Sequence, residues 1–151
     1  MNNDLTRFLF LTHVAFSLLM VGLIWCVQVV HYPLFAQVGR AEFPTYEQAH
    51  TRRITWLVAA PMLIEGVTAV LLFWCRPAGV PYWSLWTGVI LLGMIWLSTA
   101  LIQVPCHEIL SRSFDSEVHR RLVSTNWIRT FCWSLRGLLV LWMAWNSLIL
   151  K

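Results

Sequence analysis

Long apolar stretches separated by short polar segments dominate the chain, and each stretch predicts a membrane-crossing helix. A helix needs about 20 consecutive apolar residues to span the hydrocarbon layer of a bilayer. The first stretch is too long for the core of a signal peptide and is followed by no small-residue cleavage site, so we expect an uncleaved helix. The predicted membrane helices cover residues 8–30, 54–74, 82–104 and 122–149.

The composition agrees with this pattern. Hydrophobic residues make up 58% of the chain and charged residues 12%, outside the usual balance of a soluble domain. We therefore predict an all-α integral membrane protein, a single four-helix bundle of two helical hairpins over residues 1–151, with both termini on the same side. Ten Trp residues suit anchoring at membrane interfaces. Four cysteines without Cys-x-x-Cys spacing indicate no disulfide framework.

The arginines are unevenly divided between the two ends of the predicted bundle. Most lie in the connections 31–53 and 105–121, which form what we call the histidine-rich end. Because positively charged segments stay in the cytoplasm, we expect this end to be cytoplasmic and the termini outside, in a bacterial inner membrane. The net charge of +4 requires no nucleic-acid partner. The lipid bilayer is the expected partner, and a homo-oligomer or a larger membrane complex stays open.

The two connections at the histidine-rich end resemble each other. Each has a Gln, then a Pro just past the predicted helix, then a Phe, a His and an Arg pair. Proline lacks the amide donor that a helix needs, so Pro33 and Pro105 are predicted to turn the chain out of the first and third helices at the same depth. An internal duplication and a chance similarity remain equal alternatives.

The fourth predicted helix carries polar residues at helical spacing. A charge at the centre of a bilayer is costly, so this stripe should face protein. Glu65 of the second helix lies at a depth between Arg129 and Arg136, which predicts an ion pair with one of them. A structural clamp and a ligand site are both open, and the second, unpaired arginine favours an anionic or carbonyl-bearing ligand. The stripe comprises His119, Asn126, Arg129, Trp133 and Arg136.

Histidines gather at the histidine-rich end, together with Glu47 and Tyr32. Neutral imidazole is the commonest metal ligand in proteins. No His-x-x-x-His or Glu-x-x-His pair lies within one predicted membrane helix, so a metal site would have to be assembled from several helix ends. Metal or haem ligation, capping or solvated histidines, and proton transfer or substrate binding remain alternatives. His13, near the other end, is expected to be a satisfied polar group between helices. The candidate metal ligands are His31, His50, His107 and His119.

Two segments, QVPCH and NWIRT, resemble motifs of the anthrone oxygenase-like family of small four-helix membrane proteins. The resemblance is best in the second half of the chain, and both asparagines of the family's Asn-x-Pro-x-Asn motif are replaced, by Gln103 and His107. The Asn-x-x-Arg-Thr motif is matched by Asn126, Arg129 and Thr130. The resemblance implies an oxidation or binding reaction on a hydrophobic aromatic molecule.

Two functions from different classes follow. The first is an oxidoreductase or oxygenase-like enzyme acting on a small lipophilic aromatic or quinone-like ligand, with a transition metal, a haem or no cofactor. Arg129 and Asn126 would stabilise a developing oxyanion, and His107 or His119 would move the proton. The alternative is a haem-, metal- or lipid-binding membrane protein or a small subunit of a membrane complex.

A third hypothesis, a proton-coupled transporter using Glu65, has less support because four helices enclose little pathway. Arg53 is expected to face inward because it lies at i+3 from His50. The expected substrate-binding residues are Glu65, Arg53, Gln103, Arg136 and Trp133.

Overall fold

The computed structural model describes residues 3–149, and in this range the chain contains helices and no strand. The first long helical segment consists of α1 (Asn3–Cys26), the π-helical turn η1 (Val27–His31), α2 (Tyr32–Leu34) and the 3-10 turn η2 (Phe35–Gln37). The second is α3 (Phe43–Leu71), and the third joins α4 (Tyr82–Ser98), the π-helical turn η3 (Thr99–Gln103) and α5 (Val104–Leu110). The fourth is α6 (Ser116–Ile149). The predicted all-α class is confirmed.

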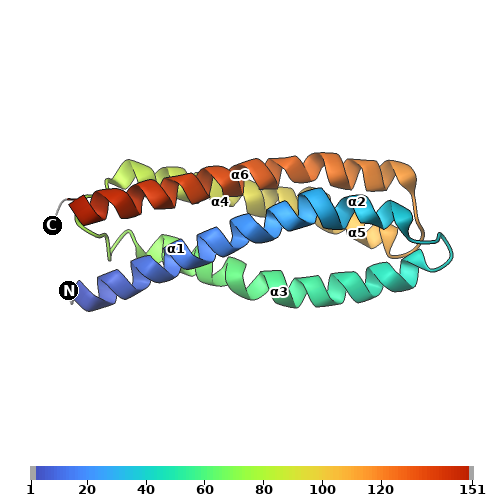
Figure 1. Cartoon of the computed structure of the whole chain (residues 1–151), viewed down its shortest axis with the longest axis horizontal. Coiled ribbons are helices and arrows are strands. Elements are labelled where there is room, and N and C mark those ends of the chain that lie inside the picture. The colour runs from blue at the N-terminus through green and yellow to red at the C-terminus, as the bar shows by residue number, and fades with distance from the viewer. Residues whose placement is uncertain (1–2, 150–151) are drawn as a thin grey trace.

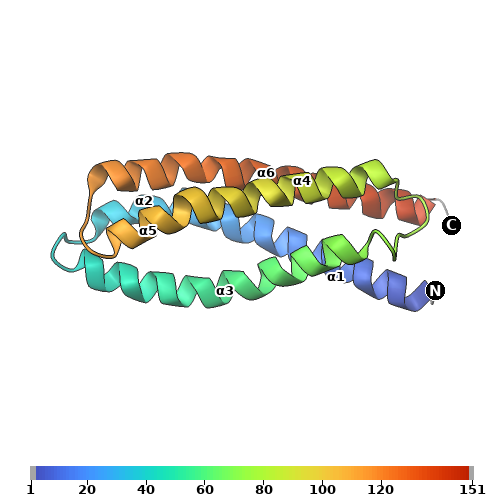
Figure 2. The ribbon, with the colours of Figure 1, turned by 180° about the vertical axis from the view of Figure 1, so that it is seen from behind.

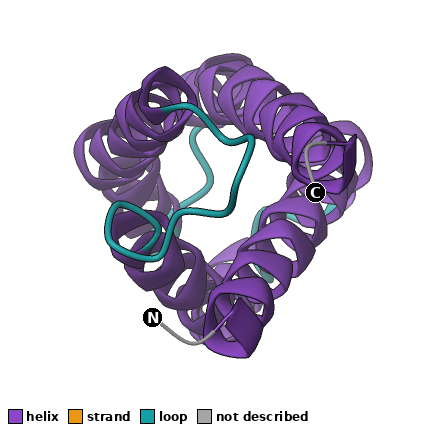
Figure 3. Cartoon of the chain, turned by 90° about the vertical axis from the view of Figure 1, so that its left-hand side faces the viewer, coloured by secondary structure: helices purple, strands orange, loops and turns teal. Residues whose placement is uncertain are grey.

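The long helical segments run along a shared long axis, and the two ends of the chain lie at the same end of the molecule (Figure 1). The reverse view shows α4 and α5 running beside α6 and α3 (Figure 2). Contacts join α1 to α3 and α6, and α4 to α3 and α6. Seen from the end that carries the termini, the helices therefore surround a central axis (Figure 3).

The helices extend beyond the predicted membrane segments at the histidine-rich end. α3 begins at Phe43 rather than at residue 54, and α6 begins at Ser116 rather than at residue 122. The connections at this end are therefore short, residues 38–42 and 111–115. Side chains that the sequence placed in loops, such as those of residues 47–50, instead have the fixed spacing of a helix.

Pro33 and Pro105 do not turn the chain out of its helices, which corrects the prediction made for them. Each proline occupies the second residue of a short α-helix that continues the segment, α2 or α5. A π-helical turn directly precedes each of these helices. A proline is tolerated in the first turn of a helix, where its missing amide donor is not needed, and a π turn is a recurrent place for the ladder to shift. Both halves of the chain thus accommodate a proline inside a long helical segment by placing a π-helical turn directly before it.

Much of the outer surface is apolar. Three helical segments are long and apolar enough to cross a membrane: Asn3–Gln37, Phe43–Leu71 and Tyr82–Leu110. α6 is not among them, and its buried Asn126, Arg129 and Arg136 lower its mean hydropathy. Beyond its polar first turns, α6 nevertheless exposes large apolar side chains, including Leu135 and Leu138.

The buried residues form two apolar clusters separated along the axis. The larger cluster lies toward the histidine-rich end and contains Phe35, Phe43 and Trp133, all completely buried. The smaller cluster, which includes Leu72 and Met143, lies toward the termini. Polar side chains are buried between these clusters and toward the histidine-rich end. Such groups are costly in an apolar interior unless they have partners, so their contacts define the candidate site.

Candidate metal centre and the buried polar residues beneath it

Three potential metal ligands converge at the histidine-rich end. Glu47 and His50 lie one turn apart on α3, and His107 lies on α5. Each offers one ligand atom, and these atoms all lie within 4.8 Å of one another. We call these three residues the triad. Two histidines and one carboxylate are the donor set of many non-haem metal sites, and they leave coordination positions open.

Two atoms of the triad are buried without a partner among the described residues: Oε2 of Glu47 and Nε2 of His50. The other carboxylate oxygen, Oε1, contacts Nδ1 of His107. Unpartnered buried donors and acceptors are rare in proteins because they lose the hydrogen bonds that water supplied. A cation bound between these side chains would satisfy both free lone pairs.

The ring nitrogens of the two triad histidines that are not used in the triad have partners of their own. Nδ1 of His50 lies 2.8 Å from Nε2 of His31. Nε2 of His107 lies 3.0 Å from the hydroxyl of Tyr32. Metal-binding histidines are held in this way in known sites, where the partner fixes the tautomer and the ring orientation. The environment of the triad is therefore suited to metal binding beyond the ligand atoms.

The completely buried Phe35 packs beside the histidine rings. Its ring centroid lies 5.1 Å from that of His50 and 5.3 Å from that of His31, both edge-on. His107 is also next to it, at 6.5 Å. An aromatic wall of this kind keeps water away from one side of the triad and limits the freedom of the rings.

The sequence-predicted metal ligands divide into two groups. His50 and His107 belong to the triad, and His31 contacts it through His50. His119 lies elsewhere, because its Nε2 donates a hydrogen bond to the backbone carbonyl of Tyr32 at 2.8 Å. Its ring stacks near Phe35 at 6.2 Å. His119 therefore anchors the first helical segment to α6.

Glu47 is a potential ligand that the sequence pattern did not predict. Glu47 and His50 form a Glu-x-x-His pair, a spacing that puts both side chains on one face of a helix. Such pairs hold metals inside four-helix proteins. Hydropathy places the start of this helix at residue 54 and so leaves the pair in a predicted loop, whereas α3 begins at Phe43. The signal would have been found by extending that helix back through the polar residues before it.

Arg129 lies beneath the triad on α6 and is 6% exposed. Its guanidinium interacts with the hydroxyl of Tyr32 and lies over the ring of Trp133, 5.3 Å from the centroid. Its Nε has no hydrogen-bond partner in the described part of the chain. Tyr32 thus connects a buried cation to His107 of the triad.

The buried amides connect helices. Asn126 donates to Oε1 of Gln28 at 2.8 Å, which engages the donor that was expected to meet an oxyanion. Gln28 in turn donates to the carbonyl of Val123 at 3.2 Å. Gln103, an expected substrate-binding residue, accepts a hydrogen bond from Ser98 at 3.0 Å within its own helical segment. Gln103 also donates to the hydroxyl of Thr125 on α6, at 3.3 Å. These contacts tie both π-helical turns to α6, and among the described residues Oδ1 of Asn126 is buried without a partner.

Glu65 and Arg136 form the predicted ion pair. Nε of Arg136 donates to Oε1 of Glu65 at 2.9 Å, and Nη2 lies 2.8 Å from the same oxygen but is poorly aligned for a hydrogen bond. Ser17 and Trp133 donate to the same carboxylate, at 2.8 and 3.1 Å. Both charged side chains are almost completely buried, so the pair joins α3 to α6 deep inside the molecule.

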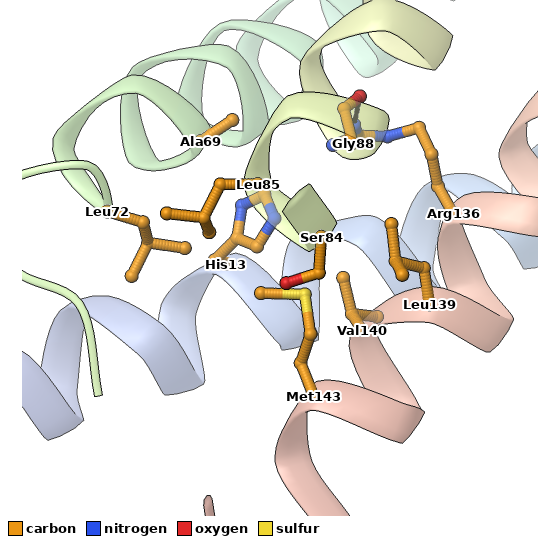
Figure 4. A pocket seen from close by; sticks show the side chains of 10 residues that line it. All are labelled: His13, Ala69, Leu72, Ser84, Leu85, Gly88, Arg136, Leu139, Val140 and Met143. Atoms are coloured by element: carbon orange, nitrogen blue, oxygen red, sulfur yellow. Dashed lines mark hydrogen bonds between the residues drawn. The ribbon is translucent and has the colours of Figure 1, made fainter. Parts of the chain in front are cut away.

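A small cavity of about 10 Å³ lies on the terminal side of this ion pair (Figure 4). Its lining includes His13, Ser84 and Arg136, and this volume suits a single water molecule. His13 itself is hydrogen-bonded to the hydroxyl of Thr68 at 2.9 Å. The expectation that His13 is a satisfied interhelical group is confirmed by this contact.

Arg53 is exposed and does not face inward, which corrects its expected orientation. Its role in substrate binding stays a prediction. The inward face of α3 is set by Glu47 and Ile54, which are seven residues apart and both at least partly buried. Arg53 is adjacent in sequence to Ile54 and is therefore rotated by about 100° away from that face.

Comparisons with known proteins assign no family to the chain. No family model matches it, no curated protein matches it, and no solved structure matches it. Inferences about its function therefore depend on the geometry of the triad and of the polar residues beneath it.

Proposed function

We propose that the chain is an integral membrane four-helix bundle of two helical hairpins, with the triad at its cytoplasmic end. The apolar outer surface and the three membrane-compatible helical segments support membrane insertion. The concentration of arginines at the triad end supports the orientation in a bacterial inner membrane. A cysteine-free variant given one cysteine at Ser113 or at Ala78 tests this. We expect a membrane-impermeant thiol reagent to label the Ala78 position in intact cells and the Ser113 position only after lysis; the reverse pattern would refute the orientation.

The triad is the observation that carries the functional proposal: it binds a divalent transition metal. Imidazole and carboxylate ligands suit iron(II), manganese and zinc, and a site with two histidines and one carboxylate is the arrangement typical of non-haem iron. Because Glu47 and His107 are in direct contact, there is no space between them for the planar ring of a haem. A single ion therefore fits these residues better than haem.

The chemistry proposed for the site is oxidation of a small lipophilic aromatic or quinone-like molecule. A metal with open coordination positions supplies Lewis-acid or redox chemistry. His31 and Tyr32 orient the ligand histidines, and Phe35 excludes water from one side. An apolar substrate reaches such a site from the bilayer, where its concentration is highest. The resemblance of QVPCH and NWIRT to the anthrone oxygenase-like family points to the same class of substrate.

Metal analysis of protein purified in mild detergent tests the proposal. After loading with iron(II), manganese or zinc and removal of free ions, we expect one tightly held ion per chain. Glu47→Gln, His50→Ala and His107→Ala should each lose it, because each removes one of three ligands. His119→Ala is the matched control and should retain it, since that ring contacts a backbone carbonyl.

The proposal is wrong if the folded wild-type protein holds none of these metals, or if the triad variants retain as much metal as His119→Ala. Cobalt substitution provides an independent reading, because the visible spectrum of bound cobalt(II) reports its coordination geometry. Turnover of a lipophilic phenol or hydroquinone by the metal-loaded protein, and not by the triad variants, would distinguish an oxidoreductase from a metal carrier.

A further inference from the structure

Arg129 is a buried cation without a carboxylate. Among residues 3–149, the ion pairs are Arg7 with Asp4, His107 with Glu47, Arg120 with Glu117, and Arg136 with Glu65. Arg129 belongs to none of these, although it is 6% exposed. Burying a charge is costly unless it is paired. The other deep arginine, Arg136, shows the usual solution, with Glu65 against its guanidinium.

The contacts that Arg129 makes leave one of its N–H donors without a partner among residues 3–149. It interacts with the Tyr32 hydroxyl and with the face of Trp133, and neither neighbour carries a full negative charge. Its Nε remains unpartnered. Arginine binds oxygen anions through several parallel N–H donors. The unpartnered N–H of this buried guanidinium is therefore able to donate to a bound anion.

The charge balance of the site points the same way. The described network runs from Arg129 through Tyr32 to His107 and Glu47. Glu47 is its single carboxylate, and a bound metal dication would outweigh that negative charge even before Arg129 is counted. A second anion beside the metal would balance the excess, and Tyr32 would connect that anion to a metal ligand.

We propose that Arg129 and Tyr32 bind the ionised oxygen of a lipophilic weak acid of the phenolate class, next to the triad. This inference rests on the proposed function and names the group of the substrate that is recognised. Phenolate fits better than phosphate because the walls are aromatic, with Trp133 beside Arg129 and Phe35 beside the histidines. A strongly hydrated phosphate would find few donors there to replace its water.

Binding of para-nitrophenol to the detergent-solubilised protein tests the proposal, because the ionised probe absorbs at longer wavelength than the neutral one. We expect the bound probe to show the phenolate band at a pH at which the free probe is mostly neutral. Arg129→Gln should weaken binding at least tenfold and abolish that band. Arg121→Gln, an exposed arginine on the same helix, should leave both unchanged. Para-nitroanisole, which cannot ionise, should bind weakly and equally to all three proteins.

Arg129→Lys is a second variant in case Arg129→Gln fails to fold. It keeps the positive charge but lacks the planar set of N–H donors of arginine. We expect intermediate affinity with the phenolate band retained. Metal content is measured on the same samples. Two results would refute the phenolate site while leaving the metal centre intact, provided that metal binds. In the first, the wild-type protein does not bind the probe as phenolate. In the second, Arg129→Gln and Arg129→Lys bind the probe as tightly as the wild type does. If no metal binds but Arg129-dependent phenolate binding is seen, the anion site stands and the proposed function fails.

Discussion

The hydroxyl of Tyr32 lies 3.0 Å from Nε2 of His107, while Nδ1 of the same ring contacts Glu47. The ring is thus held from both sides by groups on two other helical segments. Tyr32 is the first residue after one π-helical turn and His107 the fourth residue after the other, so this contact joins the two halves of the chain just beyond both turns.

Tyr32→Phe should weaken metal binding without removing it. Loss of a hydrogen bond to a ligand histidine commonly lowers metal affinity about 10- to 100-fold. Competition with a chelator measures this directly. Tyr46→Phe is the control, since Tyr46 also packs against Phe35, at 5.7 Å, but lies outside the contact with His107. Equal affinities of the two variants would show that Tyr32 does not position the ligand.

Glu65→Gln should destabilise the folded protein strongly. The change removes the negative charge beside Arg136, and breaking a buried pair by removing one partner costs about 3–5 kcal/mol. Thermal or denaturant unfolding in detergent provides the measurement. Glu117→Gln, at an exposed pair with Arg120, should cost less than about 1 kcal/mol.

The double variant Glu65→Gln with Arg136→Met gives a further check of the same pair. It should recover part of the stability lost in Glu65→Gln, because the unpaired buried charge is gone. Additive losses in the double variant would mean that the two side chains stabilise the protein independently.

Gly137→Ala should be destabilising, by about 1–3 kcal/mol. A Cβ at Gly137 would lie 2.8 Å from Cγ2 of Val21, so α6 and α1 would have to move apart. Gly22, beside Val21 on α1, has nothing within 4 Å of an added Cβ. Gly22→Ala should therefore be neutral or slightly stabilising, since alanine favours helix. Similar unfolding midpoints for both variants would contradict the close packing at Gly137.

The hydrophobic pattern was sufficient to predict the helices and an ion pair of Glu65 with Arg129 or Arg136, and the structure shows Arg136 as the partner. Depth along a helix follows from residue number, so buried charges on two helices can be matched before a structure is known. The pattern was insufficient where helices leave the apolar region. α3 continues through the polar residues 43–53, which hydropathy alone assigns to a loop, so the pattern did not predict Glu47 as a potential ligand.

The sequence pattern also did not predict, for every helix, which face points toward the interior. The spacing of Arg53 from His50 predicts an inward side chain, whereas the packing of α3 is set by Glu47 and Ile54. The free amide expected of Asn126 is used by Gln28, a residue in a π-helical turn that the sequence did not reveal. Contacts between helices depend on such local irregularities, and a regular helical pattern cannot predict them.

The two π-helical turns also suggest how the triad end could change during evolution. A π turn is equivalent to one residue inserted into an α-helix, and residues beyond it are rotated by about 100° relative to an uninterrupted helix. Loss of a single codon in η1 or η3 could turn Tyr32 or His107 away from its partner. The Glu65–Arg136 pair lies outside both turns. The arrangement of side chains at the triad end can therefore change through small insertions and deletions while the Glu65–Arg136 region keeps its register.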